Sequence, residues 1–160
     1  MATGLCLIAA SCGTTRAEFG AGGRMSATVT GLVDGDTVEV SIAGRRQLVR
    51  LIGVDTPETK HPTKPVQCGG PEASRFTAAH FPEGTKVELS RDIEARDRFG
   101  RLLAYLHRAN DGFFLNEELL RQGWARSYPF EPNTSHAMHF ARVAAEARAA
   151  LRGMWAMCHG

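Results

Sequence analysis

The strongest constraint on the fold is a series of short β-prone runs separated by turn signals. Residues 25–33, 37–42 and 45–54 are rich in β-branched residues, and TVEVSI at 37–42 alternates polar and apolar side chains, which is typical of a half-buried strand. Asp34-Gly35-Asp36 marks a turn, and Ala43-Gly44 marks a tight hairpin. The first third of the chain therefore predicts a meander of three strands.

The rest of the chain alternates between strand and helix patterns. Residues 55–71 contain four prolines and two glycines, which excludes regular structure there. Beyond them the periodicity predicts three helices and two strands: helix 72–81, strands 86–91 and 101–107, helix 114–122 and helix 133–157, the last capped by Thr134 or Ser135. Five strands with three helices predict an α+β domain, and their order fits a five-stranded Greek-key β-barrel of the OB-fold type.

Composition and charge restrict the function only loosely. A length of 160 residues with 43% hydrophobic residues indicates one globular domain. The net charge of +2 permits a polyanionic partner but is far from the strongly basic balance of many nucleic-acid-binding domains. An argument for nucleic acid must therefore come from a site.

The N-terminal segment points to export. Residues 1–12 (MATGLCLIAASC) are small, apolar and uncharged, and we expect a signal or lipoprotein segment with a lipid anchor at Cys12, although the usual basic region is missing. The alternative is a tail without a targeting role. Residues 13–24 are expected to form a flexible linker and residues 25–158 the folded domain. The expected location is secreted, at the cell surface or periplasmic.

The cysteines fit the same compartment. The chain has four cysteines and no CxxC pair, which argues against a structural zinc site. Two of them lie in the body of the chain, and in an exported protein this predicts a disulfide between Cys68 and Cys158. In a cytosolic protein they would be two free thiols.

Arg50 is the first candidate for chemistry. It stands between Val49 and Leu51 in the third predicted strand, and a guanidinium in such a strand is costly unless an anion meets it. The alternative is an arginine that extends to solvent at the barrel rim. Because Arg50 would be poorly satisfied without its ligand, we expect its replacement to cost little stability.

Several carboxylates and arginines accompany it. Asp36 and Asp55 end a turn and a strand, and Glu58 follows in a proline-stiffened turn; such oxygens suit calcium or magnesium better than zinc. Each of them alone could simply shape a turn, as we expect for Asp34. Residues 96–101 (RDRFGR) combine three arginines with an aromatic ring, which suits a phosphate and a stacked base or else forms a solvated loop.

Six runs in the same order resemble the staphylococcal nuclease family. They are VDGDTVEV (33–40), RLIGVDTPETKHP (50–62), GPEAS (70–74), DRFGRLLAY (97–105), NEELLRQGWA (116–125) and PNTSH (132–136), and the resemblance spans about residues 27–155. It implies the OB-type barrel with three helices. It also implies calcium bound by the carboxylates of Asp36 and Asp55 and by the backbone carbonyl of Thr56.

The resemblance further implies the roles of the remaining candidates. Arg50 and Arg101 would bind the scissile phosphate, and Glu58 would contact the attacking water. The nucleotide would lie among Arg98, Phe99, Leu103, Tyr128 and Phe130. Phe99 and Phe130 depart from the best-known member, which has tyrosines there, so two hydroxyl groups are lost while stacking is kept.

The expected function is therefore a calcium-dependent phosphodiesterase. It would hydrolyse DNA and RNA endonucleolytically and leave 3′-phosphates, as a monomer without a stable protein partner. One alternative is a non-catalytic OB-fold module that binds nucleic acid or peptide, and another is an export-associated structural domain. A module that had lost catalysis would lack some of the arginines and carboxylates above, and all of them are present.

Overall fold

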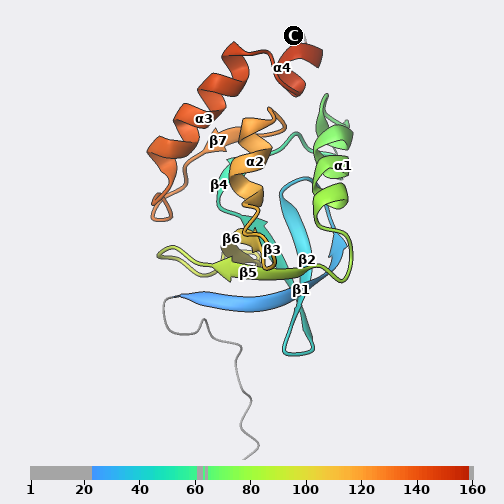
Figure 1. The fold of residues 1–160 in the computed structure, drawn as a ribbon, viewed down its shortest axis with the longest axis vertical. Coiled ribbons are helices and arrows are strands. Elements are labelled where there is room, and N and C mark those ends of the chain that lie inside the picture. The colour runs from blue at the N-terminus through green and yellow to red at the C-terminus, as the bar shows by residue number, and fades with distance from the viewer. Residues whose placement is uncertain (1–22, 61–62, 64, 159–160) are drawn as a thin grey trace, which may run out of the picture.

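Five strands close into a barrel in the computed structural model, which describes residues 23–60, 63 and 65–158. Their order around the barrel is β1-β2-β3-β6-β5, with β3 and β6 parallel and the other neighbours antiparallel. The bounds are β1 (Arg24–Leu32), β2 (Thr37–Ile42), β3 (Arg45–Leu51), β5 (Lys86–Ser90) and β6 (Leu102–Arg108). The predicted five-stranded OB-type barrel is confirmed (Figure 1). The expected N-terminal segment 1–12 and nearly all of the linker 13–24 lie outside the described residues, although Arg24 already belongs to β1.

Both predicted turns have a local chemical cause. Ala43 and Gly44 have positive φ angles of 49° and 78°, the backbone of a two-residue hairpin whose twist matches the strands. At the first turn, the backbone N–H of Asp36 donates to the Asp34 carboxylate at 3.1 Å. Asp34 therefore shapes the turn, as expected.

The prediction of one continuous third strand over residues 45–54 was wrong. β3 ends at Leu51, and β4 (Gly53–Asp55) leaves the barrel to pair antiparallel with β7 (Arg126–Tyr128). Gly53 makes this turn with φ 77°, and a Cβ atom there would lie 2.7 Å from the Phe140 ring, so a glycine is needed. β7 was not predicted, because three residues show no periodicity of their own.

The helices gather above the barrel in Figure 1: α1 (Gly70–His80), α2 (Leu115–Arg121), α3 (Ala137–Ala149) and α4 (Met154–Met157). The single helix predicted for 133–157, and with it the count of three helices, was wrong. Positive φ angles at Leu151 and Gly153 break that helix and begin the short α4. The predicted cap was also wrong, because α3 starts after His136 without a side-chain cap, and Ser135 bonds Asp92 instead. No helix in the described part of the chain is long and apolar enough to cross a membrane.

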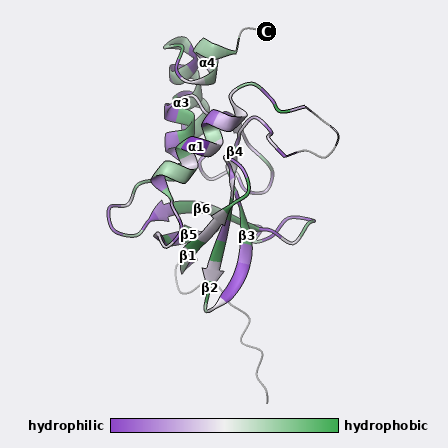
Figure 2. Cartoon of the chain, turned by 90° about the vertical axis from the view of Figure 1, so that its right-hand side faces the viewer, coloured by the Kyte–Doolittle hydropathy of each residue, from purple (hydrophilic) through white to green (hydrophobic). Residues whose placement is uncertain are grey.

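The core lies inside the barrel and under the helices. Barrel side chains such as Val38, Val49 and Leu106 are fully buried, together with Leu119 of α2 and Phe140 of α3. Figure 2 shows the most hydrophilic part of the barrel near the free end of the β2–β3 hairpin, away from this core. A disulfide joins Cys68, just before α1, to Cys158, just after α4.

Candidate active site

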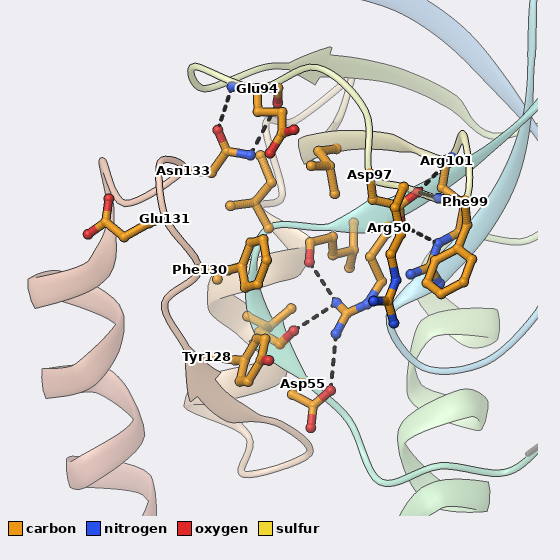
Figure 3. A pocket seen from close by; sticks show the side chains of 16 residues that line it. Arg50, Asp55, Glu94, Asp97, Phe99, Arg101, Tyr128, Phe130, Glu131 and Asn133 are labelled. Carbon is orange, nitrogen blue, oxygen red and sulfur yellow. Dashed lines mark hydrogen bonds and ion pairs between the residues drawn. The ribbon is translucent and has the colours of Figure 1, made fainter.

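A cleft of about 750 Å³ opens where β3 leaves the barrel and β4 begins. Its walls come from residues 50–55, from the loop 94–103 and from residues 128–133 (Figure 3). Eight of the eleven predicted metal, catalytic and substrate residues line it: Arg50, Asp55, Arg98, Phe99, Arg101, Leu103, Tyr128 and Phe130. The structure thus brings together residues from three distant parts of the chain.

Arg50 occupies the centre of the cleft and is well satisfied. Its terminal nitrogens donate to the carbonyls of Leu51 and Val54 at 2.7 and 2.8 Å and to Asp55 at 3.0 Å. Its Nε lies 3.3 Å from Asp36, and the side chain is only 16% exposed. The expectation that Arg50 would lack partners in the absence of substrate was wrong, because two carboxylates and two carbonyls already surround it.

Asp36 and Thr56 lie behind Arg50 rather than on the cleft wall. Asp36 Oδ2 accepts hydrogen bonds from the Thr56 backbone N–H at 2.8 Å and from its hydroxyl at 3.0 Å. Asp36 Oδ1 accepts from the Thr37 hydroxyl at 3.1 Å. Arg50 therefore connects the buried Asp36 to Asp55 at the cleft, and the two carboxylates share one guanidinium.

Negative charge is concentrated at this point. Burial raises the pKa of Asp34 to about 6, and the charge of Asp36 acts in the same direction. Burial also raises the pKa of Asp55. The positive charges of Arg50 and Arg126 oppose this increase, and the negative charges of Asp36 and Glu58 add to it. Partly dehydrated carboxylates of this kind are stabilised by a cation close by.

The donor set suits a hard cation. Asp36 and Asp55 would offer carboxylate oxygens and the Thr56 backbone a carbonyl oxygen, which is the ligand chemistry of calcium. Among the residues that the structure describes, no three histidine, cysteine, aspartate or glutamate side chains come together as a metal cluster. A cation here would have to take its other ligands from water or substrate, as an open catalytic site requires.

Glu58 is close in sequence but does not line the cleft. Its carboxylate accepts hydrogen bonds from the backbone N–H groups of Thr59 and Lys60 at 2.8 and 2.7 Å. Gln67 holds the backbone of Glu58 in place. The backbone N–H of Gln67 donates to the Glu58 carbonyl at 2.9 Å, and the side-chain oxygen of Gln67 accepts from the Glu58 N–H at 3.0 Å. Sequence reasoning missed Gln67, whose place beside Cys68 gave no motif to find it by.

The loop 94–103 holds Arg101 in position. Arg101 Nε donates to Asp97 Oδ2 at 2.7 Å and its backbone N–H to Oδ1 at 2.9 Å. Partial burial raises the pKa of Asp97, but these hydrogen bonds outweigh it and hold that pKa below its usual value. Phe99 is 68% exposed, with the guanidinium carbons of Arg98 and Arg101 at 4.8 and 5.5 Å from its ring centre. Asp97 was missed as a partner, although its spacing from Arg101 could have revealed it.

Two further aromatic rings form the opposite wall. Tyr128 and Phe130 have centroids 6.3 Å apart and nearly parallel planes, and each is more than half exposed. Figure 3 shows Phe99 on one side of Arg50 and these two rings on the other. Exposed rings beside arginines suit the bases and phosphates of a single strand. Asn133, also missed, ties this wall to the loop by bonding the backbone of Glu94 in both directions.

Comparison with known proteins identifies the family. The family model described as staphylococcal nuclease homologue matches residues 48–157. The chain is 40% identical over 124 residues to a thermonuclease of Staphylococcus hyicus, covering 78% of this chain and 72% of that protein. It is 38% identical over 133 residues to endonuclease YncB of Bacillus subtilis, covering 82% of this chain and 62% of that protein. The resemblance expected from the six sequence runs is confirmed, and the chain belongs to the staphylococcal nuclease family.

Proposed function

We propose that the protein is a calcium-dependent nuclease that hydrolyses phosphodiester bonds of DNA and RNA, within strands, leaving 3′-phosphates. The observation that carries the proposal is that Arg50, Arg101, Asp55 and three exposed aromatic rings line one cleft, with the buried Asp36 bound to Arg50 behind it. The family membership and the nuclease names of the matched proteins support it.

The two arginines would stabilise the transition state. Negative charge builds on the phosphate oxygens as the bond is cut, and fixed guanidinium donors neutralise it. The two terminal nitrogens of Arg101 have no hydrogen-bond partner in the described residues, because Asp97 binds only Nε. Arg50 must exchange its bond to Asp55 for the phosphate, which becomes favourable when the carboxylates have another cation.

Asp36, Asp55 and the Thr56 carbonyl would hold calcium. The bound ion would polarise a phosphate oxygen and orient a water molecule. Glu58 would position or deprotonate the attacking water. To do so its carboxylate must leave the amides of Thr59 and Lys60, while Gln67 keeps its backbone in place.

The rings would hold the substrate on either side of the cleaved bond. Phe99 would stack on one base and Tyr128 with Phe130 on another, with Leu103 as apolar floor and Arg98 supplying charge. The Cys68–Cys158 disulfide fits an oxidising compartment, so we also propose a secreted or cell-surface protein that acts as a monomer. The lipid anchor at Cys12 remains part of this proposal.

The test is cleavage of single-stranded DNA and RNA by the purified protein, first with calcium and then with chelator. We expect cutting only with calcium and 3′-phosphate ends on the products. Glu58→Gln should lose most activity, whereas Glu83→Gln, an exposed carboxylate outside the cleft, should cut like the parent. Binding without cutting would replace the enzyme by the non-catalytic binding module.

A further inference from the structure

Two exposed arginines lie over the ring of Trp155 outside the cleft, and a third is close to it in sequence. The guanidinium carbons of Arg126 and Arg148 lie 5.5 and 5.2 Å from its ring centre. Arg152, three residues before it, donates to the carbonyl of Arg121 at 3.2 Å. We call Arg126, Arg148, Arg152 and Trp155 the Arg–Trp patch.

The three arginines of this patch differ from their neighbours in making no close ion pair, although Arg126 lies opposite Asp55 in the β4–β7 ladder and its charge acts on that carboxylate. Arg121 forms ion pairs with Glu117 and Glu118, and Arg142 with Glu146. Within residues 23–60, 63 and 65–158, none of the three patch arginines has a carboxylate partner at ion-pair distance. Three arginines without close ion pairs on one surface raise the local positive potential, which attracts a polyanion.

The tryptophan makes this charge more ordered than a solvated face. A guanidinium near an indole ring is held by cation–π attraction, while the N–H groups in the guanidinium plane stay free to donate. Such a fork matches phosphate oxygens in geometry. The patch therefore has the chemistry of a phosphate-binding surface.

β7 connects the patch to the cleft. Arg126 and Tyr128 are two residues apart in β7, so their side chains leave the same face of the β4–β7 ribbon about 7 Å apart. Arg126 pairs with Asp55 in the ladder, and Tyr128, paired with Gly53, lines the cleft. The stacked rings, Arg126 and the other patch arginines thus follow one another along the surface.

We propose that the Arg–Trp patch binds the phosphate backbone of the substrate strand beyond the nucleotides held in the cleft. The inference rests on the proposed nuclease function and extends it, because it gives the enzyme a preference for long strands over short ones. The patch contributes charge and no base-specific contact, so the preference is for length and not for sequence.

The experiment compares two triple variants with equal loss of charge. The test variant changes Arg126, Arg148 and Arg152 to Gln. The control changes Arg24, Arg75 and Arg142 to Gln, which are exposed arginines that each have a carboxylate partner. Binding of single-stranded DNA of about 20 nucleotides, longer than the roughly 4–16 that one OB fold covers, is measured in chelator over a range of salt concentrations.

We expect the patch variant to bind about 10-fold more weakly than the control. Each lost phosphate contact lowers the salt slope by about 0.7 for a single strand, so three contacts lower it by about 2. With calcium, the ratio of kcat/KM on the long strand to kcat/KM on a dinucleotide reporter should fall similarly, which removes any effect of Arg126 on the neighbouring Asp55. A variant with the same three arginines changed to lysine keeps the charges and should keep most of the salt dependence of binding. Thermal melts of each variant establish that it is folded.

The outcomes separate the two proposals. If the patch variant and the control bind the long strand with equal affinity and slope, the patch proposal is overturned and the nuclease proposal stands. If binding depends on the patch but the parent does not cut with calcium, the patch stands and the nuclease proposal fails.

Discussion

Replacing Arg50 with methionine tests the centre of the site. Methionine keeps most of the apolar stem but removes the guanidinium, which bonds two carbonyls, Asp55 and the buried Asp36. The side chain of Asp36 is only 7% exposed. Without Arg50 it keeps only neutral hydrogen-bond donors from Thr37 and Thr56, so a buried negative charge is left without its cation.

The size of the effect follows from this burial. Removing one partner of a buried ion pair costs about 3–5 kcal/mol. Arg50 is 16% exposed and Asp55 about half exposed, so we expect the lower end, about 3 kcal/mol. At roughly 2–4 °C per kcal/mol for a chain of this size, the melting temperature in chelator should fall by about 6–12 °C. Calcium should restore part of this loss, because its charge replaces that of Arg50.

The same variant should lose transition-state stabilisation. Removing one fixed donor typically lowers turnover by about 100-fold to 1000-fold. Arg46→Met is the matched control, since Arg46 lies on the same strand, is 76% exposed and pairs with Glu39; its loss should cost under about 1 kcal/mol. If Arg50→Met melts within about 2 °C of that control, the electrostatic argument is refuted. If it also cuts like the parent, Arg50 is not part of the active site.

Three other predictions follow from the structure. The disulfide closes a loop with a sequence separation of 90, so changing Cys68 and Cys158 to Ser should cost about 4.5 kcal/mol on the chain-entropy model; equal urea unfolding curves would contradict this. Tyr128→Ala should raise KM about 10-fold with little change in kcat, because stacking helps substrate and transition state alike; a fall in kcat alone would argue against a stacking role. Burial lowers the pKa of His136, an effect that His139 adds to and Asp92 and Glu117 oppose. The folded protein therefore binds a proton at His136 less well than the unfolded chain does. The folded state keeps its full stability above a pH of about 6.5 and loses stability at lower pH, where His136 of the unfolded chain takes up a proton. His136→Gln should reduce the loss of unfolding free energy between neutral and acid pH, and an unchanged pH dependence in urea melts would exclude His136.

Local sequence signals were sufficient for most of the barrel. The alternation of residues 37–42 and the Ala43-Gly44 turn predicted β2 and its hairpin at the observed positions. Such elements depend on contacts between residues close in sequence, and their periodicity is visible without the fold. Residues 133–157 show the limit, because the alanine-rich pattern continues across Leu151 and Gly153, where the backbone turns to fit against the end of α2.

The candidate site shows the same division. Motif resemblance predicted the eight residues that line the cleft, because each carries a recognisable chemical group in a recognisable run. It did not predict their partners. The hydrogen bonds of Asp97 with Arg101, of Gln67 with Glu58 and of Asn133 with Glu94 became apparent only in the structure.

The sequence by itself determined the family and the positions of most barrel strands along the chain, and it predicted which residues we propose to bind phosphate and a hard cation. These properties belong to short segments and to side-chain chemistry. Only the tertiary structure decided that Arg50 already bridges Asp36 and Asp55, that the Glu58 carboxylate accepts from the amides of the next two residues, and that Arg126 lies over Trp155. Each of these depends on side-chain direction or on residues far apart in the chain, which closing the barrel brings together.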